Sequence, residues 1–159
     1  MLGENLGAKQ VVWLDQGIEG DDTGGHIDDI ARFTRKDQIV ISQAERGPNQ
    51  PILERNLHLL QEQQTSAEII KLPMPEACEV PGWRLPVLPA SYVNFLITNA
   101  LVLVPTFRQP QRDQFALGLL QDIFPSRQVV GIDSLDIVRE GGALHCISMQ
   151  QPLAPSKVG

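Results

Sequence analysis

Ile39-Val40-Ile41-Ser42 is a short apolar run, and a similar run, Leu101-Val102-Leu103-Val104, begins 62 residues later. Aliphatic runs of this length between turn-forming residues are typical of buried strands. The same spacing of 62 residues separates Phe33 from Phe95. The chain therefore contains an internal repeat, which is the mark of an array of similar structural units.

Each repeat has the order strand, strand, helix, strand. The first repeat is expected to contain strands at 27–33, 39–42 and 68–72 and a helix over about 51–64. The second is expected to contain strands at 92–97, 101–104 and 128–132 and a helix over 111–124. Apolar residues at helical spacing support both helices: Leu53, Leu57 and Leu60 in the first, and Phe115, Leu119, Leu120 and Ile123 in the second.

Other segments flank these units, which span roughly 27–72 and 91–133. Residues 9–14 are expected to form a strand that ends a preceding unit, and 134–151 a closing segment. Five prolines between 73 and 89 predict a loop, in which Trp83 and Arg84 either lie over a ligand or pack the loop down. We favour packing. The fold class is α/β, and 1–159 is expected to be one partial domain.

Composition excludes several classes of protein. The 159 residues are 42% hydrophobic and 20% charged, as in soluble globular domains. A net charge of −6 argues against nucleic-acid binding, although it would tolerate a cationic substrate. The longest apolar run, 100–104, is too short to cross a membrane, and the N-terminus does not resemble a signal peptide. Two cysteines form neither a disulfide framework nor a zinc pattern, so we expect a cytoplasmic protein.

The first candidate site segment is 140–151, Glu-Gly-Gly-Ala-Leu-His-Cys-Ile-Ser-Met-Gln-Gln. Gly141 and Gly142 allow backbone torsions that can aim Cys146 into a cleft, before a strand-like stretch at 147–149. A thiolate is the strongest nucleophile among side chains. The alternative is that Cys146 is a small buried apolar residue.

The second candidate segment is 20–29, Gly-Asp-Asp-Thr-Gly-Gly-His-Ile-Asp-Asp. Because His26 and Asp28 are two residues apart, both would face the same side of a strand that begins there. Between Glu19 and Asp29 there are five carboxylates and no Lys or Arg, so the local field is negative. The alternative is a solvated acidic loop.

Both segments, together with Leu88-Pro89-Ala90-Ser91-Tyr92-Val93-Asn94-Phe95, resemble motifs of the agmatine deiminases. These enzymes group with the bacterial-type peptidylarginine deiminases in the pentein, or guanidino-group-modifying, superfamily. The resemblance covers about 10–151 but only the C-terminal half of a family member. It implies a partial α/β-propeller, because penteins are built of five ββαβ modules around a pseudo-fivefold axis.

The resemblance implies a reaction and a role for each matching residue. Cys146 would attack the guanidinium carbon, His26 would transfer protons, and Asp28 would bind the guanidinium as well as serve catalysis. Asn94 is assigned to substrate binding, and Asp22 to substrate contact, to positioning His26 or to capping its loop. The substrate would be agmatine, converted to N-carbamoylputrescine and ammonia in putrescine synthesis, without cofactor or metal. Free or peptidyl arginine are alternative substrates.

Half of a family member lacks part of the site. The Arg-Asp-x-Gly-Pro-like motif of the N-terminal half, which the family uses to hold the guanidinium, is absent here. We therefore expect the chain alone to be weakly active or inactive, and to associate with a missing N-terminal half or with itself. Two further readings stay open: a non-catalytic interaction module, and a metal site built from His26, Asp28, His145 and Cys146.

Overall fold

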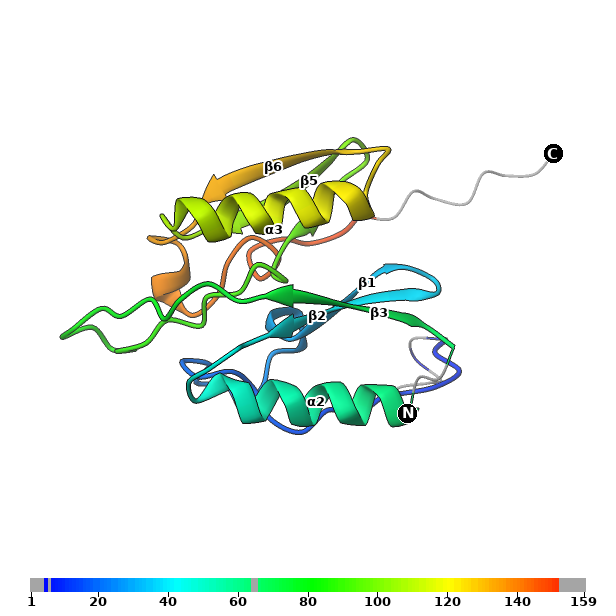
Figure 1. Ribbon diagram of the computed structural model, residues 1–159, viewed down its shortest axis with the longest axis horizontal. Coiled ribbons are helices and arrows are strands. Elements are labelled where there is room, and N and C mark those ends of the chain that lie inside the picture. Colours follow the sequence, from blue (N-terminus) through cyan, green and yellow to red (C-terminus); the bar gives the residue numbers. More distant parts are fainter. Residues whose placement is uncertain (1–4, 6, 64–65, 152–159) are drawn as a thin grey trace.

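The protein is a mixed α/β chain with two small sheets, each with a helix packed against it (Figure 1). The structure is a computed structural model, and it describes residues 5, 7–63 and 66–151. The first unit consists of β1 (Ala31–Arg35), β2 (Gln38–Gln43), α2 (Asn49–Gln63) and β3 (Glu68–Pro73). The second consists of β4 (Leu96–Ile97), β5 (Leu101–Thr106), α3 (Pro110–Ile123) and β6 (Gln128–Asp133). The 3-10 turns η1 (Ile27–Asp29) and η2 (Val138–Glu140) lie outside the sheets.

Both units share one topology, as the repeat predicts. An antiparallel hairpin is followed by a helix that returns the chain to a parallel strand, in the orders β1-β2-β3 and β4-β5-β6. The strand register corrects the spacing, however. Gln38 lies opposite the first residue of β3 and Leu101 opposite the first residue of β6, so Ile39 is equivalent to Val102 and not to Leu101. Phe33 pairs with Ile39 and Ile97 pairs with Val102, so the residue equivalent to Phe33 is Ile97 and not Phe95.

Strand β2 is buried on both faces because each face packs into a different cluster. Ile39 and Ile41 point to one side, where they pack with Leu53 and Leu60 of α2. Val40 points to the other side, into a cluster that holds most of the second unit. The first sheet therefore lies between its own helix and the second unit, an arrangement that Figure 1 makes visible.

The predicted strand at 9–14 is wrong, because these residues form no regular strand. The backbone of Trp13 instead bonds to one side chain at the end of α2. Its N–H donates to Gln63 Oε1 at 3.1 Å, and its carbonyl accepts from Gln63 Nε2 at 2.8 Å. The segment runs along α2 without a strand neighbour among the described residues.

Two further strands were predicted over too many residues. The strand expected at 27–33 begins only at Ala31, because 27–29 turn as η1, and it continues to Arg35. Only Leu96–Ile97 of 92–97 pairs as a strand. The strand-like stretch at 147–149 is a turn and coil, with Met149 91% exposed. Phe115 is also exposed, so the buried face of α3 is formed by Ala116, Leu120 and Ile123.

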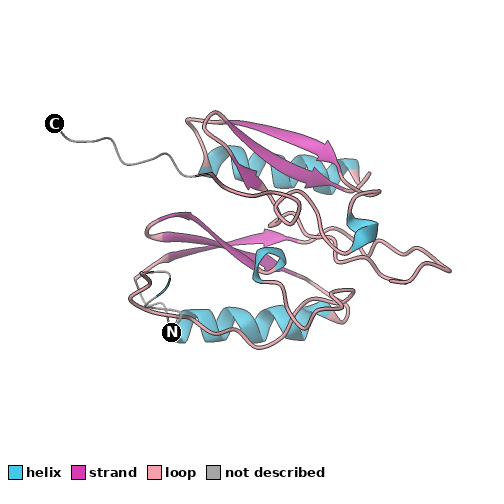
Figure 2. Ribbon diagram, turned by 180° about the vertical axis from the view of Figure 1, so that it is seen from behind, coloured by secondary structure: helices cyan, strands magenta, loops and turns pink. Residues whose placement is uncertain are grey.

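The proline-rich loop extends to one side of the molecule and carries only an isolated bridge between Glu79 and Val87 (Figure 2). Trp83 packs the loop down, as we favoured, because its Nε1 donates to the carbonyl of Arg139 at 3.0 Å. Within the described part of the chain, no helix has both the length and the apolar character needed to cross a membrane.

Candidate active site

Cys146 and Asp28 are in contact although 118 residues separate them. The Cys146 thiol donates to Asp28 Oδ2 at 3.3 Å. The same oxygen lies 2.6 Å from His145 Nδ1, so one carboxylate oxygen holds two side chains of the closing segment. Asp28 comes from η1 of the first unit, and Cys146 follows η2 after the second unit. The site therefore forms only when the two units stack.

Asn94 is the buried centre of this cluster. Its side-chain Nδ2 donates to Cys146 Sγ at 3.1 Å and to Asp29 Oδ1 at 2.9 Å. Its Oδ1 accepts from the backbone N–H groups of His145 at 2.9 Å and Cys146 at 3.4 Å. One fully buried amide thus fixes both the backbone and the sulfur of the candidate nucleophile.

Two glycines make room for this arrangement. Gly141 ends η2 with φ 98°, a left-handed torsion that favours glycine. A Cβ on Gly142 would lie 2.6 Å from the Cβ of Cys146 and 2.8 Å from its Sγ, closer than such atoms can approach. The pair of glycines is therefore required by the path of the chain beside Cys146.

The surroundings keep the Cys146 thiol protonated. Burial raises its pKa to about 11, and the carboxylates of Asp28 and Asp29 act in the same direction against the Asn94 hydrogen bond. Burial opposes ionisation of Asp28 as well, but hydrogen bonds from His145 and Cys146 bring its pKa below the ordinary value. The resting pair is thus a neutral thiol beside an ionised carboxylate.

Asp29 is the most buried carboxylate of the site, with no exposed surface. Burial raises its pKa to about 7, and the nearby charges of Asp28 and Asp21 add to the rise. Its Oδ2 has no hydrogen-bond partner, while Oδ1 accepts from Asn94. Asp29 is therefore a group whose charge is easily changed near neutral pH.

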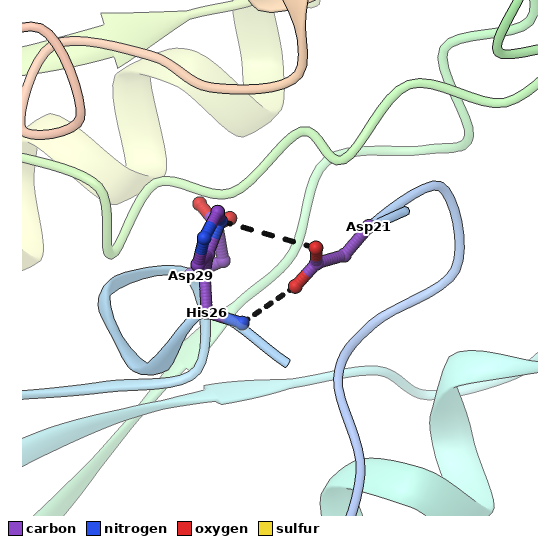
Figure 3. A group of neighbouring side chains, drawn as sticks. All are labelled: Asp21, His26 and Asp29. Atoms are coloured by element: carbon purple, nitrogen blue, oxygen red, sulfur yellow. Dashed lines mark hydrogen bonds and ion pairs between the residues drawn. The ribbon is translucent and has the colours of Figure 1, made fainter. Parts of the chain in front are cut away.

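His26 lies in the preceding loop and is held by Asp21 (Figure 3). The backbone N–H of His26 donates to Asp21 Oδ2 at 2.6 Å, and its ring Nδ1 is 3.9 Å from Asp21 Oδ1. Asp21 also accepts from the N–H and hydroxyl of Thr23, so it is the residue that fixes the loop. No hydrogen bond or ion pair joins His26 to Cys146 in the described residues. Asp29 is near both side chains, with carboxylate oxygens within 4.8 Å of a His26 ring nitrogen and of Cys146 Sγ.

The expectation that His26 and Asp28 share one face of a strand is wrong, because η1 occupies that position. Among the described residues, no hydrogen bond or ion pair joins Asp22 to Cys146. Asp22 Oδ2 accepts from Arg84 Nη1 at 2.6 Å, which ties the proline-rich loop to the His26 loop. A Cβ on Gly141 would lie 3.9 Å from Asp22 Oδ1, so this ion pair borders the closing segment.

Two groups of side chains are close enough to share a metal ion. They are Asp21, His26 and Asp29, and Asp28, Asp29 and Cys146. The four-residue metal set considered from the sequence is not among the groups found in the described residues. Asp29 belongs to both groups, so they are not two independent metal sites.

Sequence similarity to known deiminases shows the family of this chain. The sequence model of the Porphyromonas-type peptidyl-arginine deiminases matches residues 1–152. The chain belongs to the Porphyromonas-type peptidyl-arginine deiminase family. A relative from Legionella pneumophila (strain Paris) with the curated name "Putative agmatine deiminase" is 35% identical over 92% of this chain and 43% of its own length.

Solved structures of this deiminase family match the fold closely. The agmatine deiminase of Enterococcus faecalis is 28% identical, with a TM-score of 0.86 over 95% of this chain and 47% of its own. The agmatine deiminase of C. jejuni, solved with substrate bound, is 30% identical, with a TM-score of 0.83 over 91% of this chain and 42% of its own. The chain thus spans less than half of the deiminase relatives that it matches.

Sequence reasoning left two groups at this deiminase-like site without a role. His145 was considered only as a metal ligand, and Asp29 only as part of an acidic run. Both sit directly beside an assigned residue, Cys146 and Asp28 respectively. Alternation along a strand would turn each away from the site, whereas the turns observed here direct neighbouring residues inward. The adjacent carboxylates Asp28 and Asp29 are the feature of the sequence that could have indicated a place for Asp29 at the site.

Proposed function

We propose that this chain carries the nucleophile half of a guanidine deiminase that converts agmatine to N-carbamoylputrescine and ammonia. The observation that carries the proposal is the 3.3 Å contact between the Cys146 thiol and Asp28. This contact supports the proposal because it joins a thiol that can act as a nucleophile to a carboxylate suited to a planar cation. Similarity to agmatine deiminases supports agmatine as the substrate, and free or peptidyl arginine is the alternative.

The charge pattern of the site suggests how the cationic substrate activates the thiol. With a pKa of about 11, only about one thiol in ten thousand is ionised at pH 7. A guanidinium bound to Asp28 would offset the negative charge that raises this pKa. The substrate would then promote formation of the thiolate that attacks it.

The proposed reaction has two stages. The Cys146 thiolate adds to the guanidinium carbon, and ammonia leaves after a proton reaches its nitrogen from His26. Water activated by the neutral imidazole then attacks the amidino-thioether carbon. The C–S bond then breaks and the hydroxyl proton of the adduct passes to solvent, where the released ammonia takes it up, which yields the ureido product and returns the Cys146 thiolate. Asp28 aligns the substrate through paired N–H contacts, and Asn94 holds the sulfur in place.

His26 must come closer to the sulfur than its present contacts with Asp21 allow. Its side chain is 47% exposed, and glycines at 24 and 25 precede it, so the ring has room to turn. Asp22 would stay in its ion pair with Arg84 and position the loop rather than the substrate. We place the activity in the cytoplasm, where a free thiol persists, and in putrescine synthesis.

A complete enzyme would need the part of the fold that the relatives have and this chain does not span. Loss of one partner for a buried charge costs about 3–5 kcal/mol, or a thousandfold in rate at about 1.4 kcal/mol per tenfold. The 159 residues alone would therefore release ammonia weakly or not at all.

The test is ammonia release from agmatine by the chain co-expressed with the unmatched portion of the Enterococcus faecalis enzyme. We expect activity that is lost in Cys146→Ala, together with a covalent amidino adduct on Cys146 in acid-quenched samples. A complex that binds agmatine without forming the adduct or releasing ammonia would contradict the proposal.

A second candidate is a non-catalytic module that uses the same fold for interaction. The observation in its favour is an open apolar groove beside β1, lined by Val11, Ile27 and Phe33. The two candidates differ in whether Cys146 matters. Cys146→Ala would leave an interaction module unchanged and would abolish a deiminase.

A further inference from the structure

Asp29 is a fully buried carboxylate next to the candidate nucleophile, and the proposed reaction gives it no role. Its backbone carbonyl accepts from the Ser42 hydroxyl at 2.9 Å and from the Ser91 hydroxyl at 2.8 Å. Ser42 belongs to β2 of the first unit, and Ser91 lies in the segment that leads into the second. Both serines are buried, so Asp29 is held in place from both sides of the junction between the units.

The side chain of Asp29 reaches Cys146 through one intervening amide. Asn94 Nδ2 donates to Asp29 Oδ1 at 2.9 Å and to Cys146 Sγ at 3.1 Å. An amide NH2 group has two N–H donors, so one N–H is directed to the carboxylate and the other to the sulfur. Asp29 therefore fixes the orientation in which Asn94 binds the sulfur.

The second oxygen of Asp29 is not satisfied. Oδ2 is buried and has no hydrogen-bond partner among the described residues. A buried carboxylate oxygen without a donor disfavours the ionised form. Burial and the charges of Asp28 and Asp21 raise the pKa of Asp29 to about 7. Asp29 therefore changes its charge near neutral pH, whereas the pKa of Asp28 lies below its ordinary value.

The charge of Asp29 acts on the thiol. One of its carboxylate oxygens lies within 4.8 Å of Cys146 Sγ, and the ionised form helps to raise the pKa of that thiol. Figure 3 shows that Asp29 also lies beside the loop that carries His26. Other charged or titratable side chains of the described residues surround these two groups: Asp28 of η1, Asp21 and His26 of the preceding loop, Arg32 of β1 and His145 of the closing segment.

We propose that Asp29 is a positioning residue for the Cys146 nucleophile: it holds the Asn94 amide against the sulfur, and its own proton sets how much negative charge faces the thiol. Ionised Asp29 adds a second negative charge to that of Asp28, which restrains ionisation of the thiol and attracts a cation. Protonated Asp29 withdraws that charge. The inference rests on the proposed function, since it takes Cys146 to be the nucleophile, but the reaction that tests it requires no deiminase activity.

The experiment is alkylation of Cys146 by iodoacetamide in the full chain between pH 5.5 and pH 9, followed by peptide mass with Cys78 as reference. Asp29→Asn keeps an oxygen that accepts from Asn94 but cannot ionise. Parent and variant should react at about equal rates at pH 5.5, where Asp29 is protonated. At pH 8.5 the variant should react about threefold faster, because one charge at this separation shifts a pKa by about one unit.

Two histidine variants identify the group that titrates, because histidine is the other side chain that commonly changes charge between pH 5 and 8. In the parent chain, the logarithm of the rate should rise less steeply near pH 7 than on either side. This break should persist in His26→Gln and in His145→Gln and disappear in Asp29→Asn.

Asp29→Ala tests the contact through Asn94. It removes the acceptor as well as the charge, so the Asn94 amide loses the contact that directs it to the sulfur. At pH 5.5, Cys146 in Asp29→Ala should react about twofold or more slowly than in Asp29→Asn, because a weaker hydrogen bond to the thiolate raises the thiol pKa. Thermal unfolding of each variant verifies that the chain still folds.

Three results would each overturn the proposal. The first is an acceleration in Asp29→Asn that is the same at every pH, as a loosened structure would give. The second is a break that remains in Asp29→Asn and disappears in a histidine variant, and the third is equal rates in Asp29→Ala and Asp29→Asn at pH 5.5. A pH-dependent acceleration in a chain whose reconstituted complex releases no ammonia would uphold the role of Asp29 beside the thiol and contradict only the proposed function.

Discussion

Replacement of Asp28 by Asn tests whether this carboxylate keeps the Cys146 thiol protonated. Asn has the same shape but lacks the charge, and the contact it alters is the 3.3 Å approach of Sγ to Oδ2. At that separation, two unit charges interact by about 1.3 kcal/mol at the dielectric constant of water and about 5 kcal/mol at an effective value of 20. Although burial of the thiol raises its pKa, the Cys146 residue as a whole is exposed, so the lower part of this range, about 1.3–3 kcal/mol, applies. At 1.36 kcal/mol per unit, the thiol pKa should fall by about 1–2 units.

The assay is the rate of alkylation by iodoacetamide at pH 8, followed at each cysteine by peptide mass. Each unit of lowered pKa raises the thiolate fraction about tenfold, and the accompanying loss of nucleophilicity reduces the net gain to about threefold. Cys146 in Asp28→Asn should therefore react about 3 to 10 times faster than in the parent chain. Cys78, which is buried and whose pKa is also about 11, is the internal reference.

Asp22→Asn is the matched control, because it removes the same charge from the same loop region. Asp22 is paired with Arg84 and is not among the groups that shift the pKa of Cys146. The alkylation rate of Cys146 in Asp22→Asn should equal that in the parent chain. An unchanged or slower rate in Asp28→Asn would refute the electrostatic explanation of the resting thiol.

Three other predictions follow from the same geometry. Gly142→Ala should lower the free energy of unfolding by about 1–3 kcal/mol, because the new Cβ would meet Cys146. Gly118→Ala is the control and should not lower it, because a Cβ there meets open space. Urea denaturation measures the free energy of unfolding of both variants. A small guanidinium ligand that leaves the sulfur accessible should accelerate alkylation of Cys146, and protection or no change would count against thiol activation by the substrate. The folded pKa of Asp29, about 7, exceeds its unfolded value of about 3.9, so its stabilising contribution is complete below about pH 4 and is lost as pH rises towards 7. Asp29→Asn should therefore stabilise the fold more at pH 8 than at pH 5, and an equal change at both pH values would contradict the shift.

The sequence allowed the repeating units to be predicted because their strands and helices have regular periods. Residues 39–41 are buried as expected. In α2, Leu53 and Leu60 are buried and Leu57 is partly buried against the same cluster. Predictions were wrong where contacts distant in sequence decide the local structure. Residues 9–14 are apolar enough for a strand, but their backbone bonds to Gln63 and no strand lies beside them. The exposed face of α3 includes Phe115, which helical spacing alone placed inside.

The site was harder to predict than the fold, because it consists of turns. The motif resemblance identified Cys146, Asp28 and Asn94, which the structure brings into contact. It could not identify the order of contacts around them, since a strand presents alternate residues and a 3-10 turn presents neighbours. For that reason Asp29 and His145 acquire positions at the site that no period in the sequence could indicate.

The contacts of Asp28 connect the resting state of the site to the chemistry that we propose. One oxygen, Oδ2, accepts from both the Cys146 thiol and the His145 ring. A guanidinium that binds this carboxylate with two N–H groups must compete with both donors. If it displaces the thiol, Cys146 loses the acceptor that favours its protonated form at the moment when a positive carbon arrives beside it. Loss of that hydrogen bond and compensation of the negative charge both lower the thiol pKa. Asp28 can therefore restrain the nucleophile in the absence of substrate and release it when a cation binds.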